Sequence, residues 1–249
     1  MKKEKSKRYE CLDTLRGCTL ISMILYHTIW DLVYVKGIAI EWFHSNIAYI
    51  WQQSICWAFI LLSGFCWSLS KKKERRAGLV FAAGILVSLA TEIAAPQQRI
   101  LFGVLTLLGS SMFLMIPLEK IVRKVPALLG MSLAAMLFLI TKPINNGYLG
   151  IGDLGLLDLP HNWYNKGYMM TFFGFMDRDF FSTDYFSLFP WFFLFLSGYF
   201  IYRIAFENGI MDKLKSFGAG SQFLAFIGRH SLFVYLLHQP VIYLVIQFI

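Results

Sequence analysis

Charged residues are scarce in this sequence. They make up 15% of its 249 residues, whereas hydrophobic residues make up 57%. A soluble globular domain usually has about 25% charged residues. Several stretches reach the roughly 20 mostly apolar residues that a bilayer-spanning helix needs. The composition therefore excludes an ordinary soluble domain and predicts a polytopic integral membrane protein.

Cysteine is also rare, and neither repeats nor low-complexity linkers are visible, so we expect one domain over 1–249. The four cysteines lie in or beside apolar stretches and show no disulfide or metal-ligand spacing; they are Cys11, Cys18, Cys56 and Cys66. We interpret them as small apolar packing residues and expect no metal site. No short apolar core with a cleavage site follows the basic start, so we expect 1–9 to be a cytoplasmic tail that leads into a retained helix.

The net charge of +8 does not indicate nucleic-acid binding, because the basic residues lie in short clusters between apolar stretches. We predict an all-α bundle of about seven spans with the N-terminus in the cytoplasm. The expected helices are 11–35, 47–70, 78–95, 100–118, 126–142, 185–206 and 221–247. Lys and Arg concentrate in the tail and in the second, fourth and sixth connections, which are then cytoplasmic.

The longest connection, 143–184, falls on the outer side in this topology. It is rich in Gly, Asp, Asn and aromatic residues. Long loops of this kind are often lids or binding loops, and its aromatic rings could stack on a sugar. We favour anchoring at the membrane interface, where Trp and Tyr are common.

The first apolar stretch, LDTLRGCTLISMILYHTIWDL, keeps four ionisable residues: Asp13, Arg16, His27 and Asp31. On a helix that turns about 100° per residue they fall within an arc of about 60°, with Arg16 and His27 roughly 16 Å apart along the axis. Ionisable side chains inside a membrane face the bundle interior or a water-filled cavity. One alternative is structural, with Asp13 and Arg16 joining two helices. The other is catalytic, since a carboxylate four residues after a histidine can orient the imidazole ring.

Two other histidines are relevant. His44 lies in a short outer loop. His238 is followed by Gln239 and Pro240, a polar break in the last helix that we interpret as packing.

The segment LDTLRGCTLISMILYH resembles the Arg-x10-His signature of the transmembrane acyltransferase superfamily. Four further segments agree in order along the chain: FILLSGFCWSLS (59–70), ILFGVLTLLGSSM (100–112), YFSLFPWFFLFLSGYFIYR (185–203) and FIGRHSLFVYLLHQPV (226–241). The set is most similar to the bacterial branch that resembles the catalytic domain of heparan-alpha-glucosaminide N-acetyltransferase.

The resemblance implies transfer of an acyl group, usually acetyl, from cytoplasmic acyl-CoA to an amine or hydroxyl on the outer side, often on a sugar. It implies His27 as general base, Asp31 as its orienting partner, and Arg16 either as a contact to the donor or, with Asp13, as a brace of the site. Basic residues at inner helix ends, such as Arg16, Lys71 to Lys73 or Arg229, are the candidates for contacts with CoA. An acetyl-histidine intermediate is the alternative to direct transfer.

The sequence departs from the animal lysosomal enzymes of this kind. Their catalytic histidine lies in the loop between the first two helices of the catalytic domain, where His44 stands here, and an Asn often occupies the position of His27. His44 is therefore the second candidate base.

The partners implied are acyl-CoA, an amino sugar or glycan, and the lipid bilayer of a bacterial plasma membrane, with a homodimer left open. Two other functions compete with this one. A transporter for an acyl or glycan precursor would line its path with the polar stripe, and a structural partner of an envelope enzyme would not need the stripe for chemistry. No paired hydropathy repeat, typical of many transporters, is visible.

Overall fold

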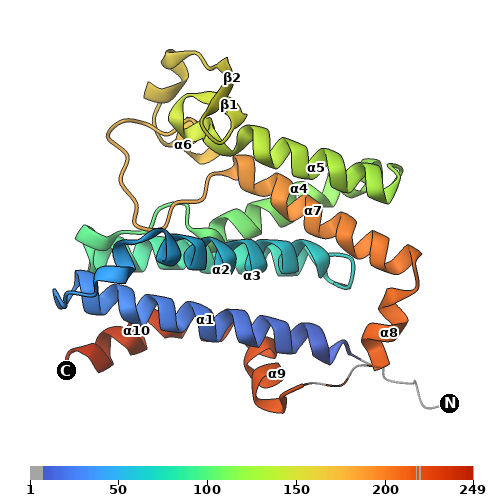
Figure 1. Ribbon diagram of the computed structural model, residues 1–249, viewed down its shortest axis with the longest axis horizontal. Coiled ribbons are helices and arrows are strands. Elements are labelled where there is room, and N and C mark those ends of the chain that lie inside the picture. Colours follow the sequence, from blue (N-terminus) through green and yellow to red (C-terminus); the bar gives the residue numbers. More distant parts are fainter. Residues whose placement is uncertain (1–7, 217, 219, 249) are drawn as a thin grey trace. The chain divides into compact units, whose positions relative to one another are not determined.

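The computed structural model describes residues 8–216, 218 and 220–248, which are mostly helical (Figure 1). They divide into two compact units. The terminal unit holds the described residues of Met1–Phe59 and Ala205–Ile249, and the central unit is Ile60–Ile204. The single domain over 1–249 stays a prediction, and most of the expected basic tail lies outside the described residues.

The terminal unit is built on the long first helix, which was expected at 11–35. Its elements are α1 (Glu10–Tyr34), a 3-10 helix (Glu41–His44), the first part of α2 (Asn46–Phe65), α8 (Ile210–Ser216), α9 (Gln222–Arg229) and α10 (Ser231–Ile246). The prediction of one continuous helix over 221–247 is wrong. The chain leaves helical geometry at His230 (φ −102°, ψ 25°), which separates α9 from α10. Ser221 caps α9, since its side-chain oxygen accepts a hydrogen bond from the Leu224 backbone N–H at 3.4 Å.

Two glycines bring α9 against the first half of α1. A Cβ atom at Gly17 would overlap the backbone of Leu224, and one at Gly228 would overlap the backbone of Asp13. Small residues allow this close backbone approach between membrane helices. The packing places the end of α9 beside the turn of α1 that carries Asp13.

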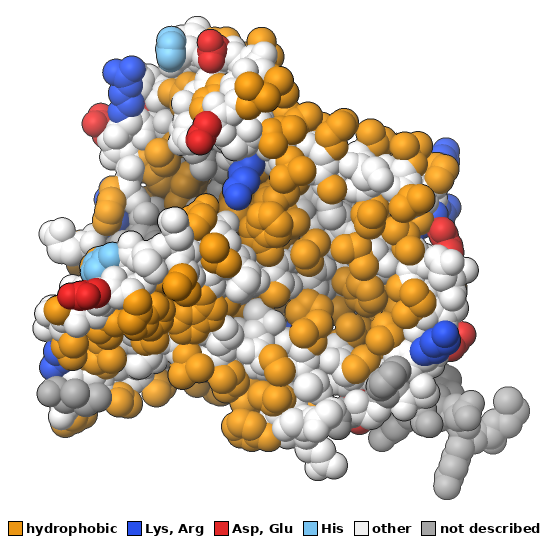
Figure 2. Space-filling model, viewed as in Figure 1, with side chains coloured by type: hydrophobic (Ala, Val, Ile, Leu, Met, Phe, Trp, Pro, Cys, Tyr) orange, Lys and Arg blue, Asp and Glu red, His pale blue; other side chains and the backbone are white. Residues whose placement is uncertain are grey.

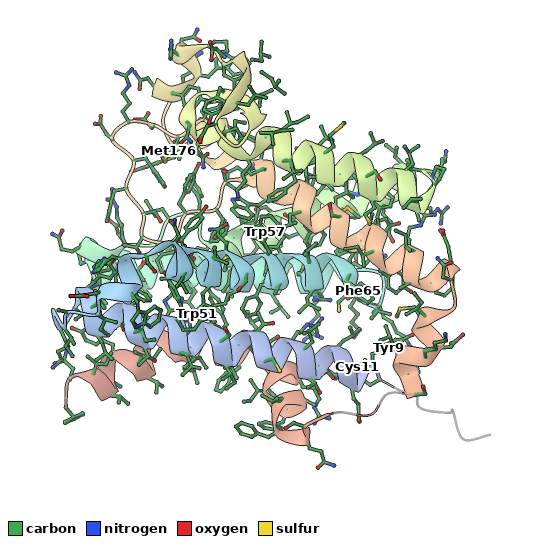
Figure 3. The ribbon with its side chains drawn as sticks, in the orientation of Figure 1. Tyr9, Cys11, Trp51, Trp57, Phe65 and Met176 are labelled. Carbon is green, nitrogen blue, oxygen red and sulfur yellow. The ribbon has the colours of Figure 1, made fainter. Side chains whose placement is uncertain are left out.

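The core of the terminal unit lies where α1 meets α2, α9 and α10. Leu20, Met23, Ile55 and Ile227 form its buried centre. Trp51 of α2 lies over α1 (Figure 3), and its indole N–H donates to the side-chain oxygen of Ser22 at 2.8 Å. These contacts hold α1 by its apolar faces and leave its polar face to the site.

The central unit contains the remaining helices and a small hairpin. The last part of α2, from Ile60, belongs to this unit, and the end of α7 (Leu188–Glu207), from Ala205, belongs to the terminal unit. The other elements are α3 (Lys73–Ala94), a 3-10 helix (Pro96–Gln98), α4 (Val104–Val122), α5 (Ala127–Thr141), a 3-10 helix (Lys142–Asn146), β1 (Tyr148–Ile151), β2 (Leu154–Asp158), a 3-10 helix (His161–Asn165) and α6 (Tyr168–Phe173). Helix α3 packs along α4, and Lys73 Nζ contacts the Glu119 carboxylate at 2.5 and 2.7 Å.

The segment 143–184 is not an open loop. It holds two of the 3-10 helices, the antiparallel strands β1 and β2, and the short helix α6. The prediction of an all-α fold is therefore wrong for this segment, although the chain is mostly helical. Tyr164 is buried there, and its hydroxyl donates to the Ile144 carbonyl at 2.5 Å. Contacts of this kind give the segment a core of its own.

Five described helices are long and apolar enough to cross a membrane: Asn46–Phe65, Lys73–Ala94, Val104–Val122, Ala127–Asn146 and Leu188–Glu207. Helix α1 is long enough but is not among them, because its ionisable residues lower its hydropathy. Helix α10 is apolar but shorter. The seven spans and the cytoplasmic N-terminus stay predictions.

The carboxylate of the half-buried Asp184 ties the connection between α6 and α7 to the start of α4. The Asp184 carboxylate accepts a hydrogen bond from the Val104 backbone N–H at 3.3 Å, and nearby the Ser182 hydroxyl accepts one from the Leu101 N–H at 2.9 Å. Burial raises the pKa of Asp184 from 3.8 to about 6, and the bond from Val104 opposes that rise. Asp184 therefore binds a proton at a higher pH in the folded protein than in the unfolded chain.

We expect Asp184 to stabilise the fold more in mild acid than at neutral pH. Its contribution to the free energy of unfolding should increase as the pH falls from about 6 to 3.8, because the folded state then binds a proton that the unfolded state does not. Thermal unfolding in detergent, measured against pH for wild type and Asp184→Asn, isolates this group. A difference between the two proteins that stays constant with pH would contradict the expectation.

Candidate active site

The four ionisable residues of α1 form two groups with partners from outside the helix. Asp13 and Asp31 are the most buried, with 3% and 1% of their surface exposed. The basic-end cluster is Arg8, Asp13 and Arg16. The His–Asp cluster is His27, Asp31, His238 and Gln239. All of these residues lie in the terminal unit.

In the basic-end cluster, one carboxylate contacts two arginines. Arg8 Nε lies 2.5 Å from Asp13 Oδ2, and an Arg16 guanidinium nitrogen lies 3.5 Å from Asp13 Oδ1. Asp13 and Arg16 thus form the expected ion pair within α1, and their role in joining helices stays a prediction. Sequence reasoning did not include Arg8, although a basic residue five positions before a buried carboxylate is a local signal.

Arg229 stands at the end of α9, directly after Gly228, which packs on the backbone of Asp13. Its side chain is exposed. The close packing of α9 on α1 thus brings Arg229 to the same end of α1 as Asp13 and Arg16. Asp13 and Arg16 are in contact with each other.

In the His–Asp cluster, Asp31 is held by a residue of α10. Gln239 Nε2 donates to both oxygens of the Asp31 carboxylate, at 3.0 and 2.9 Å. A carboxylate can only accept hydrogen bonds when ionised, so the amide nitrogen of Gln239 faces Asp31. The amide oxygen of Gln239 is buried and has no hydrogen-bond partner within the described chain.

The rings of His27 and His238 face each other across α1 and α10. Their centroids lie 5.0 Å apart, with an angle of 55° between the ring planes. His238 Nδ1 contacts the Tyr235 carbonyl oxygen. Since a carbonyl only accepts, Nδ1 carries the hydrogen, and the neutral ring has a free lone pair on Nε2. Among the described residues, His27 has no hydrogen-bonding partner.

Sequence reasoning paired Asp31 with His27 and assigned His238, Gln239 and Pro240 to packing. The structure instead gives Asp31 a hydrogen-bond donor from α10 and places His238 beside His27. The signal was the polar break itself, since a Gln and a His within an apolar helix need polar partners.

His44 lies apart from the His–Asp cluster. It is exposed at the end of a 3-10 helix, and its Nδ1 lies 3.5 Å from the hydroxyl of Tyr34. Tyr34 is seven residues after His27, so it is about 10 Å further along α1. His44 is therefore not part of the His–Asp cluster. Within the described residues, the His27 ring contacts His238 and the Asp31 carboxylate is bonded by Gln239, with no hydrogen bond or ion pair found between His27 and Asp31.

The His–Asp cluster can support proton transfer, and the basic-end cluster can support anion binding. A neutral imidazole with an unoccupied nitrogen can accept a proton. Arginines can bind phosphate groups in bidentate fashion. No group of three or more His, Cys, Asp or Glu side chains in the described ranges could hold a metal ion.

Comparison with known families gives one match. The model described as "Heparan-alpha-glucosaminide N-acetyltransferase, catalytic" matches residues 8–240. The match includes every residue of both clusters. No curated protein and no solved structure matches the chain.

We expect Gln239→Leu to destabilise the protein by about 3 kcal/mol, because it removes the donor that Asp31 uses in a buried position. Reversible unfolding in mixed micelles measures the change. The double variant Asp31→Leu/Gln239→Leu, which removes both polar groups, should be more stable than Gln239→Leu alone. If the two substitutions have additive effects, Gln239 and Asp31 do not interact as described.

Proposed function

The chain belongs to the family of the heparan-alpha-glucosaminide N-acetyltransferase catalytic domain, and from this premise we propose that it moves an acetyl group from acetyl-CoA to an amine or hydroxyl acceptor. The family and the apolar helices identify a multi-pass membrane protein with an acetyltransferase-like function. The family uses acetyl-CoA as donor. We propose a sugar as acceptor and a bacterial plasma membrane as location.

The observation that carries the proposal is the His–Asp cluster. His27 faces His238 at 5.0 Å, and Asp31, one helical turn further along α1, is held by Gln239. Among the described residues the His27 ring nitrogens have no hydrogen-bonding partner, which leaves them able to accept a proton as a general base does.

In the proposed reaction, the acceptor nitrogen or oxygen attacks the carbonyl carbon of the acetyl thioester, and its proton passes to a ring nitrogen of His27. The C–S bond of the tetrahedral intermediate then breaks. The CoA thiolate leaves and takes the proton from His27, which returns the site to its starting state. The negative charge of Asp31 favours the imidazolium between these two steps. The acetyl-histidine route stays the alternative, with His27 as the nucleophile.

The basic-end cluster would hold the phosphates of CoA. Arg8 and Arg16 share the Asp13 carboxylate, which fixes their side chains and lowers the entropy lost when a phosphate binds. Arg16 and His27 are about 16 Å apart along α1. An extended pantetheine arm running along the helix would then carry the thioester from one cluster towards the other. With the N-terminus in the cytoplasm, the donor would enter there and the acceptor from the opposite side.

We expect His27→Ala to lower kcat for acetyl transfer by about a hundredfold or more, because a positioned base typically contributes at least that much. Binding of acetyl-CoA should persist, since the basic-end cluster is unchanged. Calorimetry and a radiolabel transfer assay on the purified protein measure the two properties. The matched control is His44→Ala, which should keep nearly normal turnover. If His44→Ala loses activity and His27→Ala keeps it, the base is His44.

We expect Arg16→Gln to raise KM for acetyl-CoA roughly tenfold, because a charge-assisted hydrogen bond to phosphate contributes about 1.5–3 kcal/mol. The value of kcat should change little, since Arg16 lies far from His27. Steady-state kinetics with varied acetyl-CoA measures both. Lys124→Gln, which removes a cation from the connection between α4 and α5, is the control and should leave KM unchanged. A loss of kcat with an unchanged KM would contradict a donor-binding role.

A further inference from the structure

The hairpin of β1 and β2 has an irregular register that sorts its side chains by polarity. Leu149 pairs with Leu157 and Ile151 with Leu154, and the register shifts between Leu149 and Gly150. The shift leaves Leu156 as an extra residue, which is a β-bulge. Directly opposed residues share a face, as do alternate residues of one strand. Leu149, Ile151, Leu154 and Leu157 therefore lie on one face.

The bulge is what makes this face uniformly apolar. In a regular strand, Leu154 and Leu157 are an odd number of residues apart and would lie on opposite faces. The extra residue shifts the alternation by one position, so both fall on the same side. The hairpin becomes amphipathic although its sequence does not alternate.

The opposite face carries small and polar residues. It contains the pairs Tyr148 with Asp158 and Gly150 with Gly155. The Tyr148 hydroxyl donates to the Gly152 carbonyl at 3.0 Å, and its ring reaches within 3.7 Å of the position that a Gly155 Cβ would occupy. The Tyr148 ring thus lies across the glycine face.

Most of the apolar face is uncovered. Leu149, at its base, packs against the buried cluster of Ile144, Leu159 and Tyr164. Beyond it, Ile151, Leu154 and Leu157 are exposed by 52, 66 and 59%. A two-stranded hairpin is marginally stable in water, and contiguous exposed apolar surface marks an interaction site.

The position of the hairpin indicates which partner covers it. The apolar stretch Ala127–Asn146 is one of the five helices able to cross a membrane, and β1 begins two residues later at Tyr148. Hydrophobic side chains continue from the outer face of α5 onto the hairpin (Figure 2). Over 143–157 the sequence has one charged residue, Asp153, which lies in the turn between the strands.

We propose that the apolar face of the hairpin lies in lipid at the membrane–water interface and anchors the segment after α5 to the bilayer surface. Each strand of a two-stranded hairpin has one edge without a neighbour, and unpaired backbone groups are not tolerated in the hydrocarbon region. At the membrane–water interface, water can bind the unpaired backbone groups of the strand edges. The leucine side chains can at the same time reach the acyl chains. This anchor is independent of the acetyltransferase proposal.

The test attaches a bimane fluorophore to single cysteines in the full chain, with the four native cysteines replaced by alanine and the protein in nanodiscs. Leu154→Cys places the label on the apolar face, and Asp158→Cys places it on the opposite face of the same hairpin as a matched control. Lipids that carry a nitroxide near the headgroup report contact with the interface, and aqueous iodide reports contact with water. Leu157→Cys replaces Leu154→Cys if that variant does not fold.

We expect the nitroxide lipids to quench the label at position 154 several-fold more strongly than the label at position 158, with the opposite order for iodide. Equal quenching of both labels by iodide would place the hairpin in water and overturn the proposal. Protection of the label at position 154 from both quenchers would also overturn it, since a second protein copy or another protein would then cover the face.

Discussion

The arrangement of the site depends on the buried carboxylate of Asp31. An ionised group among apolar helices is costly unless a donor satisfies it, and Gln239 supplies that donor from α10 at 3.0 and 2.9 Å. The contact fixes this part of α10 against α1, and the neighbouring residue His238 lies with its ring beside His27. One hydrogen-bonded pair thus joins α1 to α10 and brings together residues that are more than 200 positions apart in the sequence.

Helix periodicity predicted much of the helical framework. The first helix was expected at 11–35 and is found at Glu10–Tyr34, and the apolar stretch expected at 126–142 corresponds to α5. Hydropathy did not predict the break at His230, because α9 and α10 are both apolar and the break is set by backbone geometry at a single residue. It also missed the folded segment after α5, where strands form through a bulge that no alternating pattern reveals.

The site could be predicted in part. The spacing of Asp13, Arg16, His27 and Asp31 depends only on the helical repeat, so their common face on α1 could be read from the sequence. Their partners could not, because Gln239 and His238 reach α1 through tertiary packing. The packing role of Gly17 and Gly228, which bring α9 onto α1, could not be predicted either. The sequence does not show which backbone lies opposite a glycine.

The two clusters together suggest how one helix could serve both ends of a transfer reaction. Arginines fixed by Asp13 suit an anionic donor, and the facing rings of His27 and His238 suit proton transfer from an acceptor. The apolar face of the hairpin after α5 requires a partner of another kind, which the lipid interface supplies. The family and the apolar helices agree on a multi-pass membrane protein with an acetyltransferase-like function.

The most direct measurement is vectorial transfer in sealed vesicles. The wild-type protein is reconstituted, acetyl-CoA labelled in its acetyl group is supplied on the side of the basic-end cluster, and glucosamine is trapped on the other side. The account predicts that labelled acetyl-glucosamine forms on the trapped side while free CoA thiol is released on the donor side. Movement of intact acetyl-CoA across the vesicle membrane without thiol release would contradict it and would indicate a transporter.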